Sequence, residues 1–307
     1  MTKIFIDGSA GTTGLRIADR LALRSDIAVT ILPDALRKDA SARQDAICSA
    51  DIAFLCLPDD AARESAALAG DSAVKIIDTS TAHRTAPDWA YGFPELTGCR
   101  EAVKASKRIS NPGCHASGFV ALVRPLVENG ILDANIALTC FSLTGYSGGG
   151  KKMIAEYESP ERSALLQAPR QYALTQQHKH LKEMAQRSLL ENVPAFCPIV
   201  ADFYSGMEVT IPLFAQDING SIADIRQIFA DYYKTGLVRY CDSADADGLL
   251  SAAAYSGRDD MQVGVYGNED RILLISRFDN LGKGASGAAI QNMNILMGLP
   301  EDTGLNV

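Results

Sequence analysis

The sequence predicts an α/β protein in which a Rossmann-type doubly wound parallel sheet is joined to an α+β domain. Early in the chain, apolar runs of strand length alternate with alanine-rich stretches of helix length, which indicates parallel strands with crossover helices. Later, two strand-like runs flank residues 267–270 as a hairpin, and residues 222–233 form an amphipathic helix. The predicted strands cover residues 3–7, 27–32, 51–57, 74–78, 107–110, 135–144, 200–204, 207–213, 262–266 and 271–278.

The chain has 307 residues, more than one small core usually organises, so we expect two domains. Residues 1–113, rejoined by residues 285–307, are predicted to form a dinucleotide-binding domain. Residues 114–284 are predicted to form a catalytic and substrate-binding domain. The return of residues 285–307 to the first domain is suggested by three small residues, Ala285, Gly287 and Ala288, because they let a helix pack very closely. A plain capping helix is the alternative.

Composition excludes several classes of function. The net charge of −8 argues against binding to nucleic acid or to an anionic membrane, which both require a basic surface. No apolar run reaches the length of a membrane span, and the N-terminus lacks the apolar core of a signal peptide. The seven cysteines are scattered, without a C-x-x-C pair or a zinc-like spacing. We therefore expect a cytoplasmic, reduced protein without a structural metal.

Residues 110–119, which read S-N-P-G-C-H-A-S-G-F, predict a helix N-terminus that carries an accessible cysteine. Asn111 suits the N-cap and Pro112 the first helical position, so Cys114 would lie in the first turn. The free backbone N–H groups and the positive end of the helix dipole favour a thiolate there. Cys114 is the candidate nucleophile, and a small buried core residue is the alternative.

A glycine-rich turn directly follows the first predicted strand and precedes a helical pattern at residues 15–22. Its spacing is G-x-x-G-x-x-G, which lets the turn close and brings backbone amides up to a pyrophosphate. An ordinary turn between strand and helix is the alternative. The candidate cofactor-binding residues of this turn are Gly8, Ser9, Ala10, Gly11, Thr12, Thr13 and Gly14.

The choice between the two nicotinamide dinucleotides depends on the end of the second predicted strand. Asp34 lies 20 residues after Gly14, where an acid would bind the ribose hydroxyls of NAD. Arg37 and Lys38 follow closely and could bind the 2′-phosphate of NADP. We favour NADP(H), with Arg37 as the contact, and three solvated loop charges are the alternative.

Two further loops are candidates for anion binding. Arg84 follows the strand at 74–78, at the sheet edge where ligands bind in open α/β folds, and could bind a phosphate or carboxylate. Residues 145–150 form a second glycine-rich turn, in which Ser147 and Gly148 could offer amides to the cofactor. Lys151 at its end favours an anion. A solvated arginine and a flexible loop are the alternatives.

Residues 177–184 predict the start of a helix that carries His178 and His180. Their spacing would place them on different helix faces, so they suit neither a shared metal site nor a shared role. One could face an active site while the other makes a structural bond. A solvated histidine is the alternative for each.

Taken together, the motifs resemble the short form of the N-acetyl-γ-glutamyl-phosphate reductase family, in the same order from residue 3 to residue 297. The motif D-N-L-x-K-G-A-x-G is shared with aspartate-semialdehyde dehydrogenases. The motifs Y-G-F-P-E-L and H-K-H-L-x-E-M favour the reductases. His115 stands where the family usually has tyrosine, and Lys182 where it often has proline. The motifs are G-x-x-G-x-x-G, D-T-S-T-A-H-R, Y-G-F-P-E-L, S-N-P-G-C, S-G-G-G-K-K, H-K-H-L-x-E-M and D-N-L-x-K-G-A-x-G-A-A-I-Q-N-M-N.

The resemblance implies a mechanism and a set of roles. The Cys114 thiolate would attack the acyl phosphate, and NADPH would reduce the resulting thioester to N-acetylglutamate 5-semialdehyde, a step of arginine biosynthesis. His178 would act as the acid/base, although His115 beside the nucleophile leaves that choice open. Asn280 would lie near the nicotinamide amide. The candidate substrate contacts are Arg84, Asn111 and Lys151.

Two other functional hypotheses for the sequence remain open. Aspartate-semialdehyde dehydrogenase, or another aldehyde dehydrogenase with the same covalent chemistry, is the second enzyme hypothesis. A catalytically inactive dinucleotide-binding regulator is the hypothesis from a different class. For partners we expect a small-molecule substrate, no nucleic acid and no membrane. We also expect a homo-oligomer, dimer or tetramer, in which the sheet of the second domain could pair between subunits.

Overall fold

The structure is a computed structural model that describes the backbone of residues 1–307 and every side chain except that of Thr12. The chain divides into two compact units. Unit 1 consists of Met1–Gly113 and Ala285–Leu305. Unit 2 consists of Cys114–Gly284 and Asn306–Val307.

Unit 1 contains a six-stranded sheet in the order β2-β1-β3-β4-β6-β5, and every neighbouring pair is parallel. The order reverses at β1, so the carboxyl ends of β1 and β3 form the edge where ligands bind in open parallel sheets. Five of these strands were predicted, and only β5, two residues long, was not. The strands are β1 (Thr2–Asp7), β2 (Ile27–Thr30), β3 (Ile52–Leu55), β4 (Lys75–Asp78), β5 (Ala90–Tyr91) and β6 (Arg108–Ser110).

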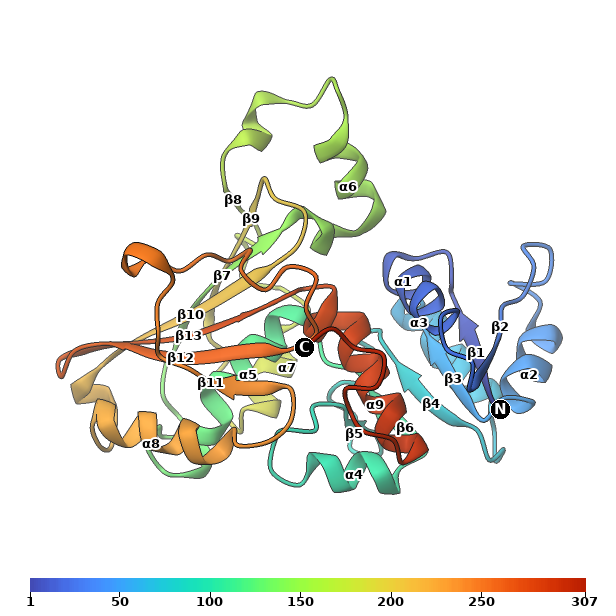
Figure 1. Ribbon diagram of the computed structural model, residues 1–307, viewed down its shortest axis with the longest axis horizontal. Helices are drawn as coiled ribbons and strands as arrows, with labels where there is room; N and C mark the ends of the chain where they lie inside the picture. The colour runs from blue at the N-terminus through green and yellow to red at the C-terminus, as the bar shows by residue number, and fades with distance from the viewer. The chain divides into compact units, whose positions relative to one another are not determined.

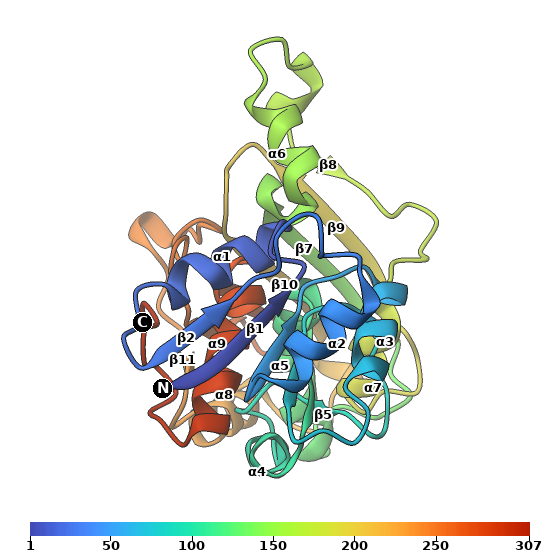
Figure 2. The ribbon, with the colours of Figure 1, turned by 90° about the vertical axis from the view of Figure 1, so that its right-hand side faces the viewer.

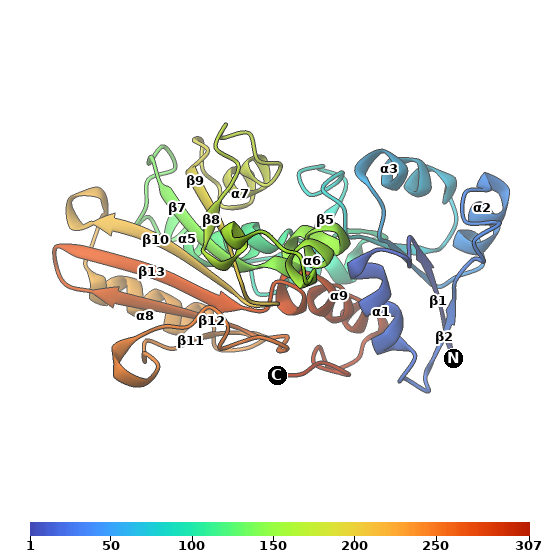
Figure 3. The ribbon, with the colours of Figure 1, turned by 90° about the horizontal axis from the view of Figure 1, so that it is seen from above.

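Helices cover both faces of this sheet, which confirms the doubly wound arrangement (Figure 3). Ile4 and Ile6 of β1 pack with Ile17 of α1, whereas Phe5 packs on the opposite face with Ile47 of α2. Because alternate residues of a strand point to opposite faces, burial on both sides explains the continuous apolar run of β1. The helices of unit 1 are α1 (Thr12–Leu21), α2 (Ala40–Cys48), α3 (Asp59–Leu68), α4 (Cys99–Ala105) and α9 (Gly287–Met297).

Unit 2 contains a seven-stranded mixed sheet in the order β11-β12-β13-β10-β7-β9-β8, which confirms an α+β fold (Figure 1). β12 and β13 form the predicted hairpin. The helix α5 packs on β10 and β13, and α8 packs on β12 and against α5. The strands are β7 (Thr139–Gly145), β8 (Arg170–Gln171), β9 (Ala195–Ala201), β10 (Met207–Phe214), β11 (Val238–Tyr240), β12 (Met261–Gly267) and β13 (Arg271–Phe278).

The other helices of unit 2 are α5 (Cys114–Glu128), α6 (Gly150–Glu158), α7 (Leu181–Arg187) and α8 (Ile222–Tyr232). Figures 1 and 2 both show the segment that carries α6 projecting beyond the end of β7. Stacking of Tyr146 on Tyr157, with a centroid separation of 4.7 Å, holds this segment together. The second glycine-rich turn lies at its base.

Several predicted boundaries were wrong, three of them at β9, α5 and α7. The strand predicted at 200–204 is β9 at Ala195–Ala201, and its signal was hidden by Pro198, which lacks the N–H that a strand normally contributes. The helix predicted to begin at Pro112 begins at Cys114, and the helix predicted from residue 177 begins at Leu181. The later starts of α5 and α7 change the site, because they alter which atoms hold Asn111, His178 and His180.

Candidate active site

Cys114 is the first residue of α5 and is half-buried, so its sulfur lies at the helix N-terminus as predicted. The backbone N–H groups of a first helical turn have no partner within the helix and favour a negative charge beside them. The helix is held by burial of its apolar residues, which pack on the sheet of unit 2. These are Phe119, Val120, Leu122, Val123 and Leu126.

Asn111 does not cap α5, contrary to the sequence interpretation. Its Nδ2 donates to the carbonyl of Ala285 at 3.0 Å, and its Oδ1 accepts from Nδ2 of Asn292 at 3.3 Å. Asn111 therefore ties the end of β6 to the segment that begins α9. Its predicted contact with the substrate stays a prediction.

The turn Asp279–Gly284 lies against Cys114. A Cβ atom added to Gly284 would stand 3.0 Å from the Cβ of Cys114. The backbone N–H of Gly284 donates to the carbonyl of Asp279 at 2.9 Å and closes the turn. A side chain at position 284 would crowd the cysteine, a contact that the sequence interpretation missed.

A cluster of two histidines and a tyrosine forms around His115, the residue that follows Cys114, and we call the four residues the histidine cluster. The ring centroid of His115 lies 5.7 Å from that of His178 and 5.6 Å from that of His180. The rings of His178 and His180 are 4.8 Å apart, and Tyr172 lies 6.1 Å from His178. The expectation that His178 and His180 lie on different helix faces was wrong, because both precede α7.

His115 is buried, with 4% of its surface exposed, and both of its ring nitrogens are engaged. Nδ1 lies 2.6 Å from the hydroxyl of Ser142, and Nε2 lies 2.7 Å from the hydroxyl of Tyr172. Burial, together with the nearby His178, lowers the pKa of His115 to about 3. A neutral ring without a free nitrogen cannot exchange protons with Cys114.

His178 has the properties that His115 lacks. It is half-buried, and burial followed by the charge of Lys179 lowers its pKa below the usual 6.5, so the ring is neutral at physiological pH. Its Nδ1 accepts a long hydrogen bond of 3.2 Å from the backbone N–H of His180. Its Nε2 has no hydrogen-bond partner among the described residues.

An open cavity beside His178 makes this ring accessible. Its volume is about 570 Å³, and Lys179 and Lys182 are the cations that line it. Neither lysine forms an ion pair with a described residue. The cavity is also lined by Gln177, Leu181, Ala185, Gln186, Leu190 and Val193.

Tyr172 is half-buried and was not singled out from the sequence. Burial raises the pKa of its phenol, and the negative charge of Cys114 raises it further, so the hydroxyl keeps its proton. The hydroxyl of Tyr172 lies 2.7 Å from Nε2 of His115, so Tyr172 contacts the residue that follows Cys114. This contact could not be inferred from the sequence, because residues 115 and 172 are separated by a strand and a projecting segment.

Three residues predicted to bind the cofactor come together in unit 2. Nδ2 of Asn280 donates to the hydroxyl of Ser147 at 3.0 Å, and Oδ1 of Asn280 accepts from the backbone N–H of Gly206 at 2.9 Å. A Cβ atom added to Gly148 would lie 3.6 Å from Nδ2 of Asn280. Asn280 therefore orders the second glycine-rich turn, and its contact with a nicotinamide stays a prediction.

The glycines of the first turn differ in what surrounds them. Gly8 has a φ of +87°, and a Cβ there would come within 2.3 Å of the carbonyl oxygen of Cys56. A Cβ on Gly14 would lie 2.5 Å from the carbonyl oxygen of Gly8. At Gly11 the nearest atom would be 3.6 Å away, so the fold does not require glycine there. The side chain of Thr12 lies outside the described residues.

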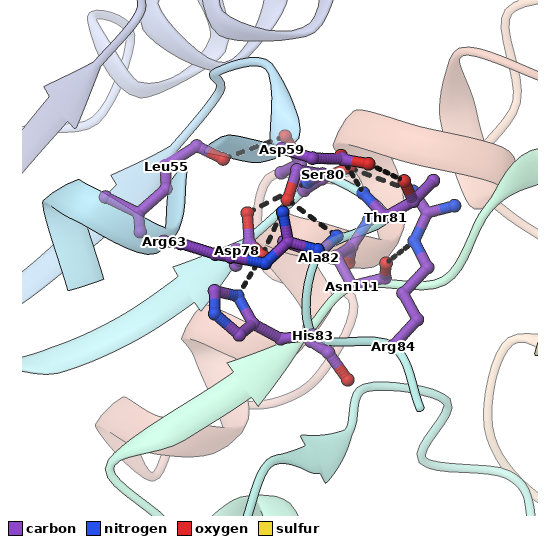
Figure 4. A network of polar contacts seen from close by, with 12 residues as sticks. Leu55, Asp59, Arg63, Asp78, Ser80, Thr81, Ala82, His83, Arg84 and Asn111 are labelled. Carbon is purple, nitrogen blue, oxygen red and sulfur yellow. Dashed lines mark hydrogen bonds and ion pairs between the residues drawn. The ribbon is translucent and has the colours of Figure 1, made fainter. Parts of the chain in front are cut away.

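Arg84 lies in a buried polar network that follows β4 (Figure 4). Its Nε donates to the carbonyl of Asn111 and its Nη2 to the carbonyl of Thr79, both at 2.9 Å. Asp78 holds the same loop by accepting from Ser80 and by pairing with His83. Arg84 therefore ties the ends of β4 and β6 together, and its contact with the substrate stays a prediction.

The remaining candidate cations are accessible. Arg37 lies 3.6 Å from Asp34, and both side chains are more than half exposed. Lys151 is exposed in the first turn of α6. In the described part of the chain, no group of three or more His, Cys, Asp or Glu could hold a metal ion, and no helix is long and apolar enough to span a membrane.

Comparison with known proteins identifies the family. Residues 33–106 match the family described as "Semialdehyde dehydrogenase, NAD binding domain", and residues 114–280 match "Semialdehyde dehydrogenase, dimerisation domain". N-acetyl-γ-glutamyl-phosphate reductase 2 of Nostoc sp. is 47% identical over 99% of both chains. The chain belongs to the N-acetyl-γ-glutamyl-phosphate reductase family. Its relative from Sinorhizobium medicae is 43% identical over 96% of this chain and 98% of its own.

Solved structures agree on the fold. Aspartate semialdehyde dehydrogenase II of Vibrio cholerae superposes with a TM-score of 0.72 at 15% identity, covering 97% of this chain and 98% of that one. The aspartate semialdehyde dehydrogenase of Candida albicans gives a TM-score of 0.68 at 16% identity, covering 97% and 98%. At such identities the likeness concerns the fold alone. Within the family, the chain therefore combines a nicotinamide-dinucleotide-binding domain with a mixed-sheet domain.

Proposed function

We propose that the chain reduces N-acetyl-γ-glutamyl phosphate to N-acetylglutamate 5-semialdehyde and phosphate with NADPH. The observation that supports this most is the placement of Cys114 on the first turn of α5, next in the chain to His115, whose ring centroid lies 5.7 Å from that of the neutral His178. Among the curated relatives, those at 43–47% identity carry the corresponding name. The reaction is proposed to take place in the cytoplasm, where free thiols stay reduced.

Cys114 is proposed as the nucleophile. Its thiolate attacks the acyl carbon, the carbon–oxygen bond to phosphate breaks, and a thioester to Cys114 forms. Phosphate leaves as a stable anion and needs little help from an acid. The backbone N–H of Cys114 is a proposed donor to the oxygen that becomes negative during attack.

His178 is proposed as the acid/base. It accepts the proton when Cys114 ionises and returns it to the oxygen of the reduced intermediate. Proton uptake at Nδ1 requires loss of the bond from the His180 N–H, which costs little because that bond is 3.2 Å long. His115 is excluded from this role, since both of its nitrogens are bonded.

The glycine turn at 8–14 is proposed to hold the pyrophosphate of the cofactor, whose nicotinamide supplies the hydride. The open space at Gly11 fits this role, because a backbone without a side chain lets phosphate oxygens approach the amides. Arg37 is proposed to bind the 2′-phosphate, and Ser147, Gly148 and Asn280 the nicotinamide end. We expect Arg37→Ala to lower the preference for NADPH over NADH by about tenfold, measured as the ratio of kcat/KM values. Equal use of both by the wild type would contradict NADP.

Arg84, Asn111 and Lys151 are proposed as substrate contacts. Lys151 has the strongest support, because a lysine in the first turn of α6 faces the positive end of the helix dipole. Such a charge destabilises the helix slightly, and an anionic ligand would offset that cost. Arg84 is proposed to act mainly by holding the loop before Cys114, since two of its nitrogens already bind carbonyl groups.

A homo-oligomer is proposed to form through the outer face of the unit 2 sheet. On the face opposite α5 and α8, Phe141, Phe214 and Leu273 are 44%, 56% and 39% exposed. An apolar sheet face of this kind is commonly covered by a partner. We expect Leu273→Glu to shift the mass measured by light scattering towards the monomer. Leu23→Glu, at a position 88% exposed in unit 1, is the matched control.

The assay that tests the proposed function runs in the reverse direction. We expect phosphate-dependent reduction of NADP with N-acetylglutamate 5-semialdehyde, and none with aspartate semialdehyde. The opposite preference would assign the chain to aspartate semialdehyde oxidation instead. Absence of turnover with both, together with a Cys114 no more reactive to iodoacetamide than the other cysteines, would favour an inactive dinucleotide-binding protein.

A further inference from the structure

A buried chain of three polar groups leads from the sheet of unit 2 to the neighbourhood of Cys114. It begins at the hydroxyl of Ser142 on β7, passes through both nitrogens of His115 on α5, and ends at the hydroxyl of Tyr172. Ser142 is fully buried and His115 is 4% exposed, so water does not replace these bonds. The chemistry proposed above for Cys114 and His178 makes no use of this chain of hydrogen bonds.

The direction of the hydrogen bonds follows from the number of hydrogens available. A neutral imidazole donates at one nitrogen and accepts at the other. The Ser142 hydroxyl has no other hydrogen-bond partner among the described residues, and a buried hydroxyl hydrogen without an acceptor costs about 1–3 kcal/mol. Ser142 therefore donates to Nδ1 of His115, which places the hydrogen of the ring on Nε2.

This arrangement frees the hydrogen of Tyr172. Because Nε2 of His115 donates to the phenol oxygen at 2.7 Å, the phenol O–H must donate elsewhere. That hydroxyl has no second partner in the described part of the chain. Tyr172 is bonded to the ring of His115, the residue that follows Cys114, and its own ring centroid lies 6.1 Å from that of His178. The free hydrogen is therefore carried by a side chain that is bonded to His115, the residue that follows Cys114.

We propose that Tyr172 is a further catalytic residue, whose hydroxyl donates a hydrogen bond to the oxygen that becomes negative when the acyl carbon is attacked at Cys114. His115 is the positioning residue that orients this hydroxyl, and Ser142 sets the tautomer of His115. No proton is transferred by Tyr172, since it stays a neutral phenol throughout. The inference rests on the proposed thioester chemistry and adds a donor to it.

The primary test is Tyr172→Phe, which removes one hydroxyl and keeps the ring. We expect kcat for N-acetylglutamate 5-semialdehyde to fall by roughly 10- to 100-fold, with KM within about threefold, because a donor to a developing oxyanion acts in the transition state. Acylation of Cys114 by p-nitrophenyl acetate should slow similarly, since it passes through the same kind of oxyanion. Alkylation by iodoacetamide forms no oxyanion, so its rate against pH should not change.

Matched variants separate positioning from packing. His115→Gln keeps an amide donor near the position of Nε2 and should retain more activity than His115→Phe. Ser142→Ala should lower kcat by roughly 3- to 10-fold, because the tautomer is no longer held. Ser276→Ala is the control for Ser142→Ala. Ser142 and Ser276 are both fully buried, and they lie opposite Val209 of β10 on the two strands that flank it. The hydroxyl of Ser276 forms no hydrogen bond with a described residue, so its loss should leave kcat unchanged. Tyr240→Phe, at a partly exposed tyrosine, should leave both rates unchanged.

Each outcome decides the inference. The inference is overturned if Tyr172→Phe keeps both kcat and the rate of acylation within threefold of wild type. It is also overturned if the substitution changes KM and the rate of alkylation by iodoacetamide as much as it changes kcat. If the wild type is acylated but does not reduce NADP with N-acetylglutamate 5-semialdehyde, and Tyr172→Phe slows acylation, the proposed function fails while the inference stands. If p-nitrophenyl acetate does not acylate Cys114 at all, both fail.

Discussion

The glycine turn of unit 1 is built from consecutive residues, whereas the histidine cluster of unit 2 gathers its members from distant segments of the chain. In the turn, Gly8 and Gly14 are required by nearby backbone atoms, and Gly11 is not. In the cluster, His115 is fully bonded and His178 is not. In both regions, identical residue types play different parts, and the atoms around each residue decide which part it plays.

Residues that hold the fold differ from residues left free for chemistry in how completely their atoms are contacted. A residue whose contacts are satisfied within its own unit supports the structure, as Gly14 and His115 do. A residue whose surroundings leave space or an unbonded atom is available to a ligand, as Gly11 and His178 are. Substitutions in each region test this distinction.

The largest effect is expected at the nucleophile. Cys114→Ser should lower phosphate-dependent reduction of NADP by at least about 10³-fold, because a serine hydroxyl is not ionised at neutral pH. Iodoacetamide should label Cys114 before Cys56, whose pKa burial raises to about 12. Peptide mass mapping after limited labelling checks the order. Preferential labelling of Cys56 would contradict the assignment.

Replacing the free histidine should have the next largest effect. His178→Asn should lower kcat by about 10²–10⁴-fold while the protein stays folded, because an amide cannot exchange a proton at neutral pH. Circular dichroism before and after the substitution controls for folding. A variant within a few-fold of wild type would move the acid/base role to His180.

The glycine turn offers a matched pair of substitutions. Gly14→Ala should lower the free energy of unfolding by about 1–3 kcal/mol, because its Cβ would lie 2.5 Å from the Gly8 carbonyl oxygen. Gly11→Ala should keep the free energy of unfolding within about 0.5 kcal/mol of the wild-type value. It should instead weaken cofactor binding by roughly tenfold. Urea unfolding and dinucleotide titration measure the two effects. Equal destabilisation by both variants would contradict the distinction.

The smallest expected effect is a shift in pH dependence. The pKa of His178 is lowered by burial and then by Lys179, and the neutral ring is the active base, so kcat/KM should fall as pH drops through that lowered pKa, below 6.5. Lys179→Ala removes a repelling charge, raises the pKa of His178 and moves the acid limb to higher pH. The rate on the acid limb should fall by roughly twofold, with no change at pH 8. An acid limb that does not move would exclude electrostatic coupling between the two residues.

Much of unit 1 could be predicted because its signals are local. The continuous apolar run of β1, the turn after it and the alternation with helices are each properties of neighbouring residues. The capped start of α5 was predicted in outline, although Asn111 bonds to Ala285 and α5 begins at Cys114. In unit 2, Pro198 concealed β9, and with it the strand that pairs with β7.

The sequence by itself determined the α/β alternation, the glycine turn and the cysteine at a helix start, because these depend on contacts between residues near each other in the chain. Only the tertiary structure decided that His115 is bonded at both nitrogens, one of them to Tyr172, that Gly284 adjoins Cys114, and that His178 keeps a free nitrogen. Those properties arise from long-range packing. They depend on which buried atoms meet across the fold, and no local pattern encodes that.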